Sequence, residues 1–220
     1  MRILQHVVRA MDQNVYILFD QDTKEGVIID PGNDARRILD IVEENNIDVQ
    51  CILLTHGHGD HIGAVEALKE AKGYPVAAHR WEVGVLEDEQ ANLSGSIFGK
   101  TEFTPDILLE DNQVLAVGKE RIRVIHTPGH TIGGVCFYCE KSGILFSGDT
   151  LFYASIGRTD FPNPPVKDGI GFPMEENFPR LIASIKEKLY VLPDDTLVYP
   201  GHGGETRIGF EKKFNPFVKG

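Results

Sequence analysis

Short apolar runs alternate with amphipathic stretches along this chain, and the alternation predicts strands and helices in turn. An apolar run of about four to eight residues is typical of a buried strand, whereas apolar positions three and four apart indicate a helix. In the first half, strands are predicted at residues 3–8, 15–19, 27–29, 51–54 and 76–78. Helices are predicted at residues 35–44, 62–72 and 80–86.

The second half of the chain repeats this order of elements. Strands are predicted at residues 107–109, 121–125, 134–138, 143–146 and 197–199. A helix is predicted at residues 176–189, because its apolar side chains follow helical spacing: Phe178, Leu181, Ile182, Ile185 and Leu189. Strand-rich halves followed by helices indicate an α/β layered domain. The 220 residues suffice for one substantial core, so we expect a single domain, residues 1–220, with two similar halves of about 1–115 and 116–220.

Two stretches without a regular pattern are predicted to frame a substrate. Residues 87–106 include Phe98, which is a substrate-binding candidate, and residues 161–173 hold four prolines and two glycines. A long loop without secondary structure of its own is often functional, although an ordinary surface connection is an equal alternative for either stretch. The prolines of the second stretch favour a stiff wall over a mobile lid.

Charge and composition narrow the class of protein. The formal net charge of -11 argues against a nucleic-acid surface, which normally carries a basic patch. No apolar run is long enough to span a membrane, and residues 1–8 lack the apolar region and cleavage site of a signal peptide. We therefore expect a cytoplasmic protein with no nucleic-acid or membrane partner. The oligomeric state is left open.

The chain has three cysteines, two of which, Cys136 and Cys139, lie in one apolar run. A thioredoxin-like or zinc-binding pair is one interpretation of this spacing. On a strand, however, residues three apart point to opposite faces, so the two thiols are predicted to be core residues that do not share an ion. Cys51 is also predicted to be core, and free thiols indicate a reducing compartment.

The densest group of potential metal ligands is the segment Thr-His-Gly-His-Gly-Asp-His at residues 55–61. It follows a predicted strand directly, and its two glycines allow the backbone to bend. His56 and His58 are two apart, so they leave the same side of an extended segment, whereas Asp60 and His61 follow the bend. A segment that supplies ligands to two neighbouring points suits a two-metal centre. The alternative, a polar loop with solvated histidines, is much weaker because imidazole is the commonest metal ligand.

Three further polar residues occupy the same kind of position later in the chain. His130 lies in Thr-Pro-Gly-His-Thr, Asp149 in Ser-Gly-Asp-Thr and His202 in Tyr-Pro-Gly-His-Gly. Each follows a predicted strand and a glycine, and active-site groups commonly lie on loops at strand ends. These residues are therefore candidates to complete the metal centre.

The chain resembles the metallo-β-lactamase superfamily over nearly its whole length in the order of seven residues: His56, His58, Asp60, His61, His130, Asp149 and His202. Three further segments resemble the branch of small, single-domain glyoxalase II-like hydrolases: residues 14–18, 148–152 and 157–162. The resemblance implies a four-layer αββα sandwich of two mixed β-sheets with outer helices.

The resemblance also implies two divalent metal ions per chain. The first ion would be held by three histidines: His56, His58 and His130. The second would be held by three other side chains: Asp60, His61 and His202. Asp149 would bridge the two ions. Zinc is the expected metal because imidazole and carboxylate are its usual ligands, while iron and manganese remain candidates. The carboxylates Asp60 and Asp149 are the predicted catalytic residues, and a bridging water would be deprotonated near neutral pH.

The implied reaction is hydrolysis of an acyl bond, with a thioester such as S-D-lactoylglutathione as the substrate. A thiol has a pKa of about 8.5, so a thiolate departs without an acid, whereas an amide nitrogen needs a proton. Full-length glyoxalase II enzymes carry an added C-terminal helical segment with basic residues for glutathione, and this chain ends shortly after His202. Another small thiol is therefore a candidate carrier beside glutathione.

Arg158 lies where glyoxalase II enzymes have a basic residue that contacts the thiol carrier. Its guanidinium is a donor fork suited to a carboxylate, which makes Arg158 the second substrate-binding candidate. A structural ion pair with Asp160 is the alternative. His79 and His126 are expected to be structural, because the set of seven ligands is complete without them.

Three alternative functions remain consistent with the same residues. A persulfide dioxygenase shares the sequence Gly-Arg-Thr-Asp-Phe and uses one iron bound by two histidines and an aspartate, although its early strand differs from residues 14–16. A lactonase or a β-lactamase uses the same scaffold. A metal-binding scaffold or redox partner module, which would not be an enzyme, is the third alternative, although such domains usually lose some of these ligands.

Overall fold

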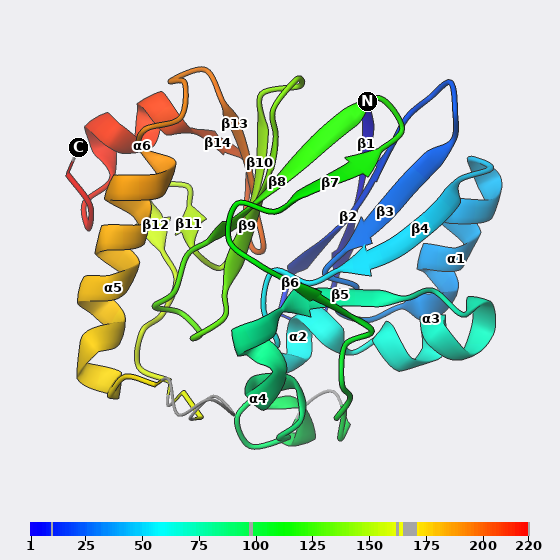
Figure 1. The fold of residues 1–220 in the computed structure, drawn as a ribbon, viewed down its shortest axis with the longest axis horizontal. Coiled ribbons are helices and arrows are strands. Elements are labelled where there is room, and N and C mark those ends of the chain that lie inside the picture. The colour runs from blue at the N-terminus through cyan, green and yellow to red at the C-terminus, as the bar shows by residue number, and fades with distance from the viewer. Residues whose placement is uncertain (10, 97–98, 162, 165–170, 220) are drawn as a thin grey trace.

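The computed structural model describes residues 1–9, 11–96, 99–161, 163–164 and 171–219. They form two six-stranded sheets that face each other, with helices on the outer side of each sheet (Figure 1). The predicted αββα sandwich of two mixed sheets is therefore confirmed. Within the described part of the chain, no helix combines the length and apolar character that crossing a bilayer requires.

The first sheet combines an antiparallel part with a parallel part. Its strands lie in chain order: β1 (Arg2–Val8), β2 (Gln13–Phe19), β3 (Glu25–Ile29), β4 (Asp48–Leu53), β5 (Val76–His79) and β6 (Ile107–Leu109). The strands from β1 to β3 pair antiparallel, whereas those from β3 to β6 pair parallel. Parallel neighbours need crossover connections, which α1 (Ala35–Glu44) and α3 (Val65–Lys72) provide on one outer face of the sandwich.

The second sheet has the order β14-β13-β10-β9-β8-β7. Its strands are β7 (Val114–Val117), β8 (Glu120–His126), β9 (Val135–Cys139), β10 (Ile144–Gly148), β13 (Leu197–Pro200) and β14 (Thr206–Arg207). A small hairpin, β11 (Leu151–Phe152) and β12 (Ser155–Ile156), follows β10. The other outer layer holds α5 (Asn177–Ser184), which continues as a π-helical turn at Ile185–Leu189, and α6 (Ile208–Phe214).

Three apolar clusters correspond to the three spaces between the four layers. The first lies under α1 and α3 and includes Ile38 and Leu68, the second lies between the sheets and includes Phe146, and the third lies under α5. Cys139 belongs to the inter-sheet cluster and Cys136 to the cluster under α5. The prediction that these two thiols point to opposite faces is confirmed.

Some helix boundaries differ from the prediction. The helix expected at residues 62–72 is two helices, α2 (Gly59–Ile62) and α3, because the chain turns at Gly63. A Cβ atom on Gly63 would lie 2.2 Å from the carbonyl oxygen of Gly32, and the Ala64 amide donates to the Pro31 carbonyl at 2.9 Å, so a distant segment packs against the break. The helix expected at residues 80–86 begins as a 3-10 turn, Arg80–Glu82, before α4 (Val83–Leu86). Further 3-10 turns occur at Ser94–Ser96 and Met174–Glu176.

Candidate metal centre

The predicted ligands come together at one end of the sandwich, where several strands end. His56 and His58 follow β4, His130 follows β8, Asp149 follows β10 and His202 follows β13. Because β8, β10 and β13 run in the same direction, their carboxyl ends lie at the same edge of the second sheet. Apolar strands thus position the polar loops, and all seven predicted ligands converge there.

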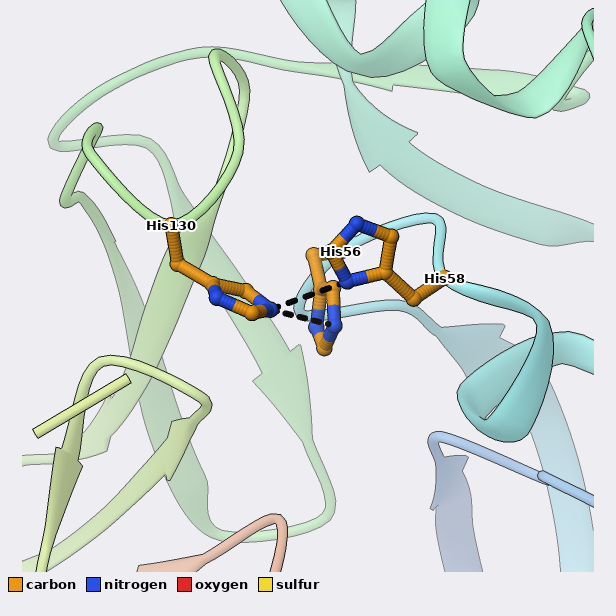
Figure 2. Close-up of side chains that lie close together, drawn as sticks. All are labelled: His56, His58 and His130. Carbon is orange, nitrogen blue, oxygen red and sulfur yellow. Dashed lines mark hydrogen bonds between the residues drawn. The ribbon is translucent and has the colours of Figure 1, made fainter. Parts of the chain in front are cut away.

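We define site 1 as His56, His58 and His130, whose rings face one another from two loops (Figure 2). His130 Nε2 lies 2.9 Å from His58 Nδ1 and 3.3 Å from His56 Nε2. All three side chains are buried. Three imidazole nitrogens that point at a common centre are a donor set suited to a zinc-like ion.

We define site 2 as Asp60, His61 and His202. His202 Nε2 lies 3.1 Å from Asp60 Oδ2 and 3.4 Å from His61 Nε2. His61 is fully buried, whereas Asp60 and His202 are partly exposed. Site 2 therefore combines a carboxylate with two imidazoles on the more open side of the centre.

Asp149 spans the two sites. Its Oδ1 atom lies 3.3 Å from His61 Nε2, and its Oδ2 atom lies 3.6 Å from both His130 Nε2 and His202 Nε2. Oδ1 is buried and has no hydrogen-bond partner among the residues that the structure describes. A buried carboxylate oxygen without a donor is costly, and a divalent cation between the sites would satisfy it. The residues present therefore fit a pair of metal ions.

Outer hydrogen bonds orient the rings. In four of the five histidines, the ring nitrogen that faces away from the centre lies within hydrogen-bond distance of an oxygen. These pairs are His56 with Thr55 Oγ1 (3.1 Å), His61 with Asp30 Oδ2 (3.0 Å), His130 with Arg158 O (2.8 Å) and His202 with Met11 O (3.1 Å). An N–H that donates outward leaves the inner nitrogen unprotonated, which is the tautomer that binds a metal.

Asp30 supports both sites, and the sequence reasoning missed it. Its carboxylate accepts hydrogen bonds from the Thr55 amide (2.7 Å), the Thr55 hydroxyl (2.5 Å) and His61 Nδ1 (3.0 Å). The Thr55 hydroxyl in turn contacts His56, so one carboxylate orders a ring in each site. A signal was present, because Asp30 follows β3 directly, just as the predicted ligands follow their strands.

The electrostatics of the two sites differ. Burial, followed by the neighbouring imidazole of His130, lowers the pKa of His58 to about 3. Burial also lowers the pKa of His56 and His130, so the rings of site 1 are neutral. Burial alone would lower the pKa of His61 and His202, but the carboxylates of Asp149 and Asp60 outweigh it and raise the pKa of both.

A sequence profile of the metallo-beta-lactamase superfamily matches residues 8–202, which contain all seven side chains. The chain belongs to this superfamily. It is 36% identical to the hydroxyacylglutathione hydrolase GloC of Haemophilus influenzae over 96% of this chain and 95% of that protein. Among solved structures, the BLEG-1 B3 metallo-beta-lactamase is 39% identical and superposes over the whole of both chains with a TM-score of 0.86. TTHA1623 in a di-iron-bound form is 33% identical, with a TM-score of 0.80 over 98% of this chain and 100% of that chain.

A cavity of about 440 Å³ opens onto the centre of this metallo-beta-lactamase superfamily member. Besides ligand side chains, it is lined by Met11, Leu93, Phe152, Arg158 and Phe161. Leu93 and Phe161 come from the two stretches that were predicted to frame a substrate. Phe98, the other candidate in the first stretch, lies outside the described residues, as do residues 162 and 165–170 of the second stretch.

Arg158 faces the cavity and also forms the ion pair that was its alternative interpretation. Its Nε and a terminal nitrogen donate to the two carboxylate oxygens of Asp160 at 2.9 Å and 2.7 Å. Its guanidinium carbon lies 4.4 Å from the ring centroid of Phe161. Both charged side chains are largely exposed, so Arg158 is held at the cavity mouth without being sequestered from solvent.

His79 and His126 lie apart from the candidate ligands. Their rings are stacked with centroids 4.2 Å apart and an interplanar angle of 8°. Trp81 packs edge-on against both rings, and His126 Nε2 donates to the carbonyl oxygen of Ile132 at 2.9 Å. Burial, followed by the charge of His126, lowers the pKa of His79 to about 3. The pair therefore packs as neutral rings, in agreement with a structural role.

Proposed function

We propose that this protein is a hydrolase that cleaves thioesters with two divalent metal ions bound in sites 1 and 2. The observation that carries the proposal is the convergence of seven potential ligands beside one cavity, which five of them line, with imidazole nitrogens directed inward by outer acceptors. Similarity to GloC, whose name is hydroxyacylglutathione hydrolase, supports a thioester as the substrate.

The proposed roles follow from the geometry of the two sites. Ions held there would supply a hydroxide nucleophile near neutral pH and would polarise the carbonyl oxygen of the substrate. Asp149 would hold the two sites at a fixed separation, because its two oxygens face different histidines. Asp60 adds a second carboxylate on the exposed side of the centre. Zinc suits these donors, and iron and manganese are the other candidates.

The cavity favours a leaving group that needs no proton. Among the described lining residues outside the two sites and Asp149, none carries a carboxyl, imidazole or phenol group that could protonate an amine. A thiolate departs unassisted because thiols have a pKa of about 8.5, whereas an amide nitrogen must be protonated. A thioester is therefore the acyl substrate that best suits these residues.

The walls of the cavity favour a small substrate with apolar parts. Met11, Leu93, Phe152 and Phe161 provide apolar surface around the centre. Arg158 lies at the mouth, where its guanidinium can attract a carboxylate on the acyl group or on the thiol carrier. We propose a small anionic thioester, with S-D-lactoylglutathione as the reference compound.

Hydrolysis rates on a matched series of thioester, aryl ester and amide with one acyl group, beside a lactone assayed separately, would test the proposal. We expect the rate to decrease as the leaving group becomes more basic, with the amide slower by orders of magnitude. Each 1.36 kcal/mol of barrier is about a tenfold change in rate. Comparable rates on the amide and the thioester would show that an acid assists and would overturn the assignment.

β-Lactam hydrolysis is a second candidate, because the BLEG-1 B3 metallo-beta-lactamase superposes on the whole chain at 39% identity. The same metal-loaded protein can be assayed on penicillin, cephalosporin and carbapenem substrates beside the thioester series. A higher kcat/KM on any of these β-lactams than on every thioester would replace the first proposal with this one.

A further inference from the structure

Glu82 is a buried carboxylate that the proposed reaction does not use. It ends the 3-10 turn Arg80–Glu82, and only 1% of its surface is exposed. Its Oε1 atom accepts a hydrogen bond from the Gly57 amide at 2.7 Å. Its Oε2 atom accepts hydrogen bonds from the Gly133 amide at 2.8 Å and the Thr131 hydroxyl at 3.0 Å. A carboxylate with this degree of burial is retained only where its donors compensate for desolvation.

The donors to Glu82 belong to two different ligand loops. Gly57 lies between His56 and His58 in the loop that follows β4 of the first sheet. Thr131 follows His130 in the loop that joins β8 and β9 of the second sheet. One side chain therefore links the two loops whose histidines make up site 1.

The contacts around Glu82 leave little room for the loops to shift. A Cβ atom on Gly133 would lie 2.3 Å from the backbone nitrogen of Glu82 and 2.7 Å from its Oε2 atom. A Cβ atom on Gly57 would lie 3.0 Å from side-chain atoms of both Val85 and Leu86. A second link, the hydrogen bond from the Val135 amide to the Thr55 carbonyl (2.8 Å), holds the loops at the strand ends. Glu82 holds them nearer the ligands themselves.

We propose that Glu82 is a positioning residue that fixes the spacing between His58 and His130 and thereby sets the metal affinity of site 1. The inference rests on the proposed binding of two ions. None of the hydrogen bonds described for Glu82 reaches a ligand of site 2, so we expect its effect to fall mainly on site 1. Outer interactions of this kind typically change metal affinity by about 10- to 100-fold.

Replacement Glu82→Gln tests the proposal, because glutamine has one acceptor oxygen where glutamate has two. It can accept from Gly57 or from Gly133, but not from both. In chelator competition with zinc, we expect the affinity of one site to decrease by about 10- to 100-fold and that of the other to stay unchanged. Imidazole ¹⁵N–¹H NMR during the titration would assign the weakened step to His56, His58 and His130.

Glu211→Gln is a matched control. Glu211 is fully buried and accepts hydrogen bonds from the Thr206 hydroxyl (2.6 Å), the Asn215 amide (2.8 Å) and the Ala154 backbone nitrogen (3.0 Å). Its replacement should destabilise the fold while leaving the zinc affinity of site 1 unchanged. Equal weakening of site 1 in both variants would overturn the role of Glu82. Unaltered zinc affinity of site 1 in both variants would overturn it as well.

Thr131→Val provides a milder variant should Glu82→Gln not fold. It removes one of the three donors to the carboxylate and keeps the shape of the side chain. We expect a several-fold loss of zinc affinity confined to site 1, and unaltered affinity would contradict the inference. Wild-type protein that binds no zinc at all would instead refute the proposed function, so the two failures are distinguishable.

Discussion

Sites 1 and 2 contain the same number of side chains but differ in charge and in exposure. The three imidazoles of site 1 are neutral and buried. Site 2 includes the carboxylate of Asp60, and the side chains of Asp60 and His202 remain 14% and 25% exposed. Neutral imidazoles avoid the cost of burying charge, whereas a carboxylate at the open side can remain partly solvated. The carboxylate of Asp60 is thus kept partly solvated, although His61 of the same site is fully buried.

The supports behind the two sites act at different levels. Asp30 hydrogen-bonds the ring of His61 directly, so it fixes the orientation of a side chain. Glu82 hydrogen-bonds the amides of Gly57 and Gly133, so it fixes the position of the backbone. A metal centre needs both, because ligand atoms must lie within a few tenths of an ångström of their ideal positions. The comparison predicts that different substitutions will impair the two sites separately.

Asp149→Ala is expected to have the largest effect, because the two carboxylate oxygens of Asp149 lie close to histidines of both sites. Elemental analysis should find about two equivalents of metal in the wild type and at most one in the variant. The rate of thioester hydrolysis should decrease by about 10³-fold or more, which corresponds to about 4 kcal/mol.

His79→Gln is the control for Asp149→Ala, since it alters a buried histidine outside both sites and should keep two equivalents of metal. Full metal content and full activity in Asp149→Ala would disprove the bridging role. A saturated wild type with a single equivalent would contradict the binuclear proposal and favour the mononuclear iron dioxygenase.

Asp30→Asn is expected to weaken site 2 more than site 1. Asparagine keeps the shape of the side chain but replaces a charged acceptor of the His61 ring with a neutral amide. The zinc affinity of site 2 should decrease by about 10- to 100-fold, with a smaller decrease at site 1 through Thr55 and His56. In chelator competition, Asp30→Asn should therefore weaken mainly site 2, whereas Glu82→Gln should weaken mainly site 1. The same pattern in both variants would mean that the two supports do not act on separate sites.

The sequence predicted the fully buried strands, whereas the elements that it missed are short. Every residue of β2 and β9 is buried, and both strands were predicted from their apolar runs. In contrast, β7 alternates between exposed and less exposed positions over only four residues, and β14 has two residues, so neither was predicted. The C-terminal helix α6 was also missed. Short, partly exposed elements depend on tertiary contacts more than on a pattern of their own.

The seven candidate ligands could be predicted because each lies in or shortly after a polar segment that follows an apolar strand. Asp30 carries the same signal, because it follows β3 directly, but it lies outside the seven-residue order that carried the family resemblance. Glu82 has no such signal, because its partners Gly57 and Gly133 lie 25 and 51 positions away in the sequence. Contacts of that separation become visible only once the two sheets are packed.

His79→Gln should change the pH dependence of stability without changing the metal content. The pKa of His79 is about 3 in the folded protein, against about 6.5 for an unfolded histidine. Between these values the unfolded chain binds the proton and the folded protein does not, so His79 makes the wild type less stable as pH decreases. Between pH 6.5 and 3, the free energy of unfolding should therefore depend on pH less steeply in the variant than in the wild type, by up to about 1.4 kcal/mol per pH unit. Urea unfolding of both proteins at a series of pH values would measure it, and parallel pH profiles would contradict the buried neutral state.

Arg158→Met is expected to have the smallest effect, because the guanidinium is exposed and already paired with Asp160. KM for anionic thioesters should rise by about two- to fivefold, with little change for neutral thioesters and in kcat, since an exposed charge contributes to binding only weakly. Asp160→Asn is the matched variant: it frees the guanidinium from its partner and should lower KM for the same anionic substrates. The two substitutions therefore shift KM in opposite directions if Arg158 contacts the substrate. Unaltered kinetics in Arg158→Met on every anionic thioester would leave the ion pair with Asp160 as the sole role of this side chain.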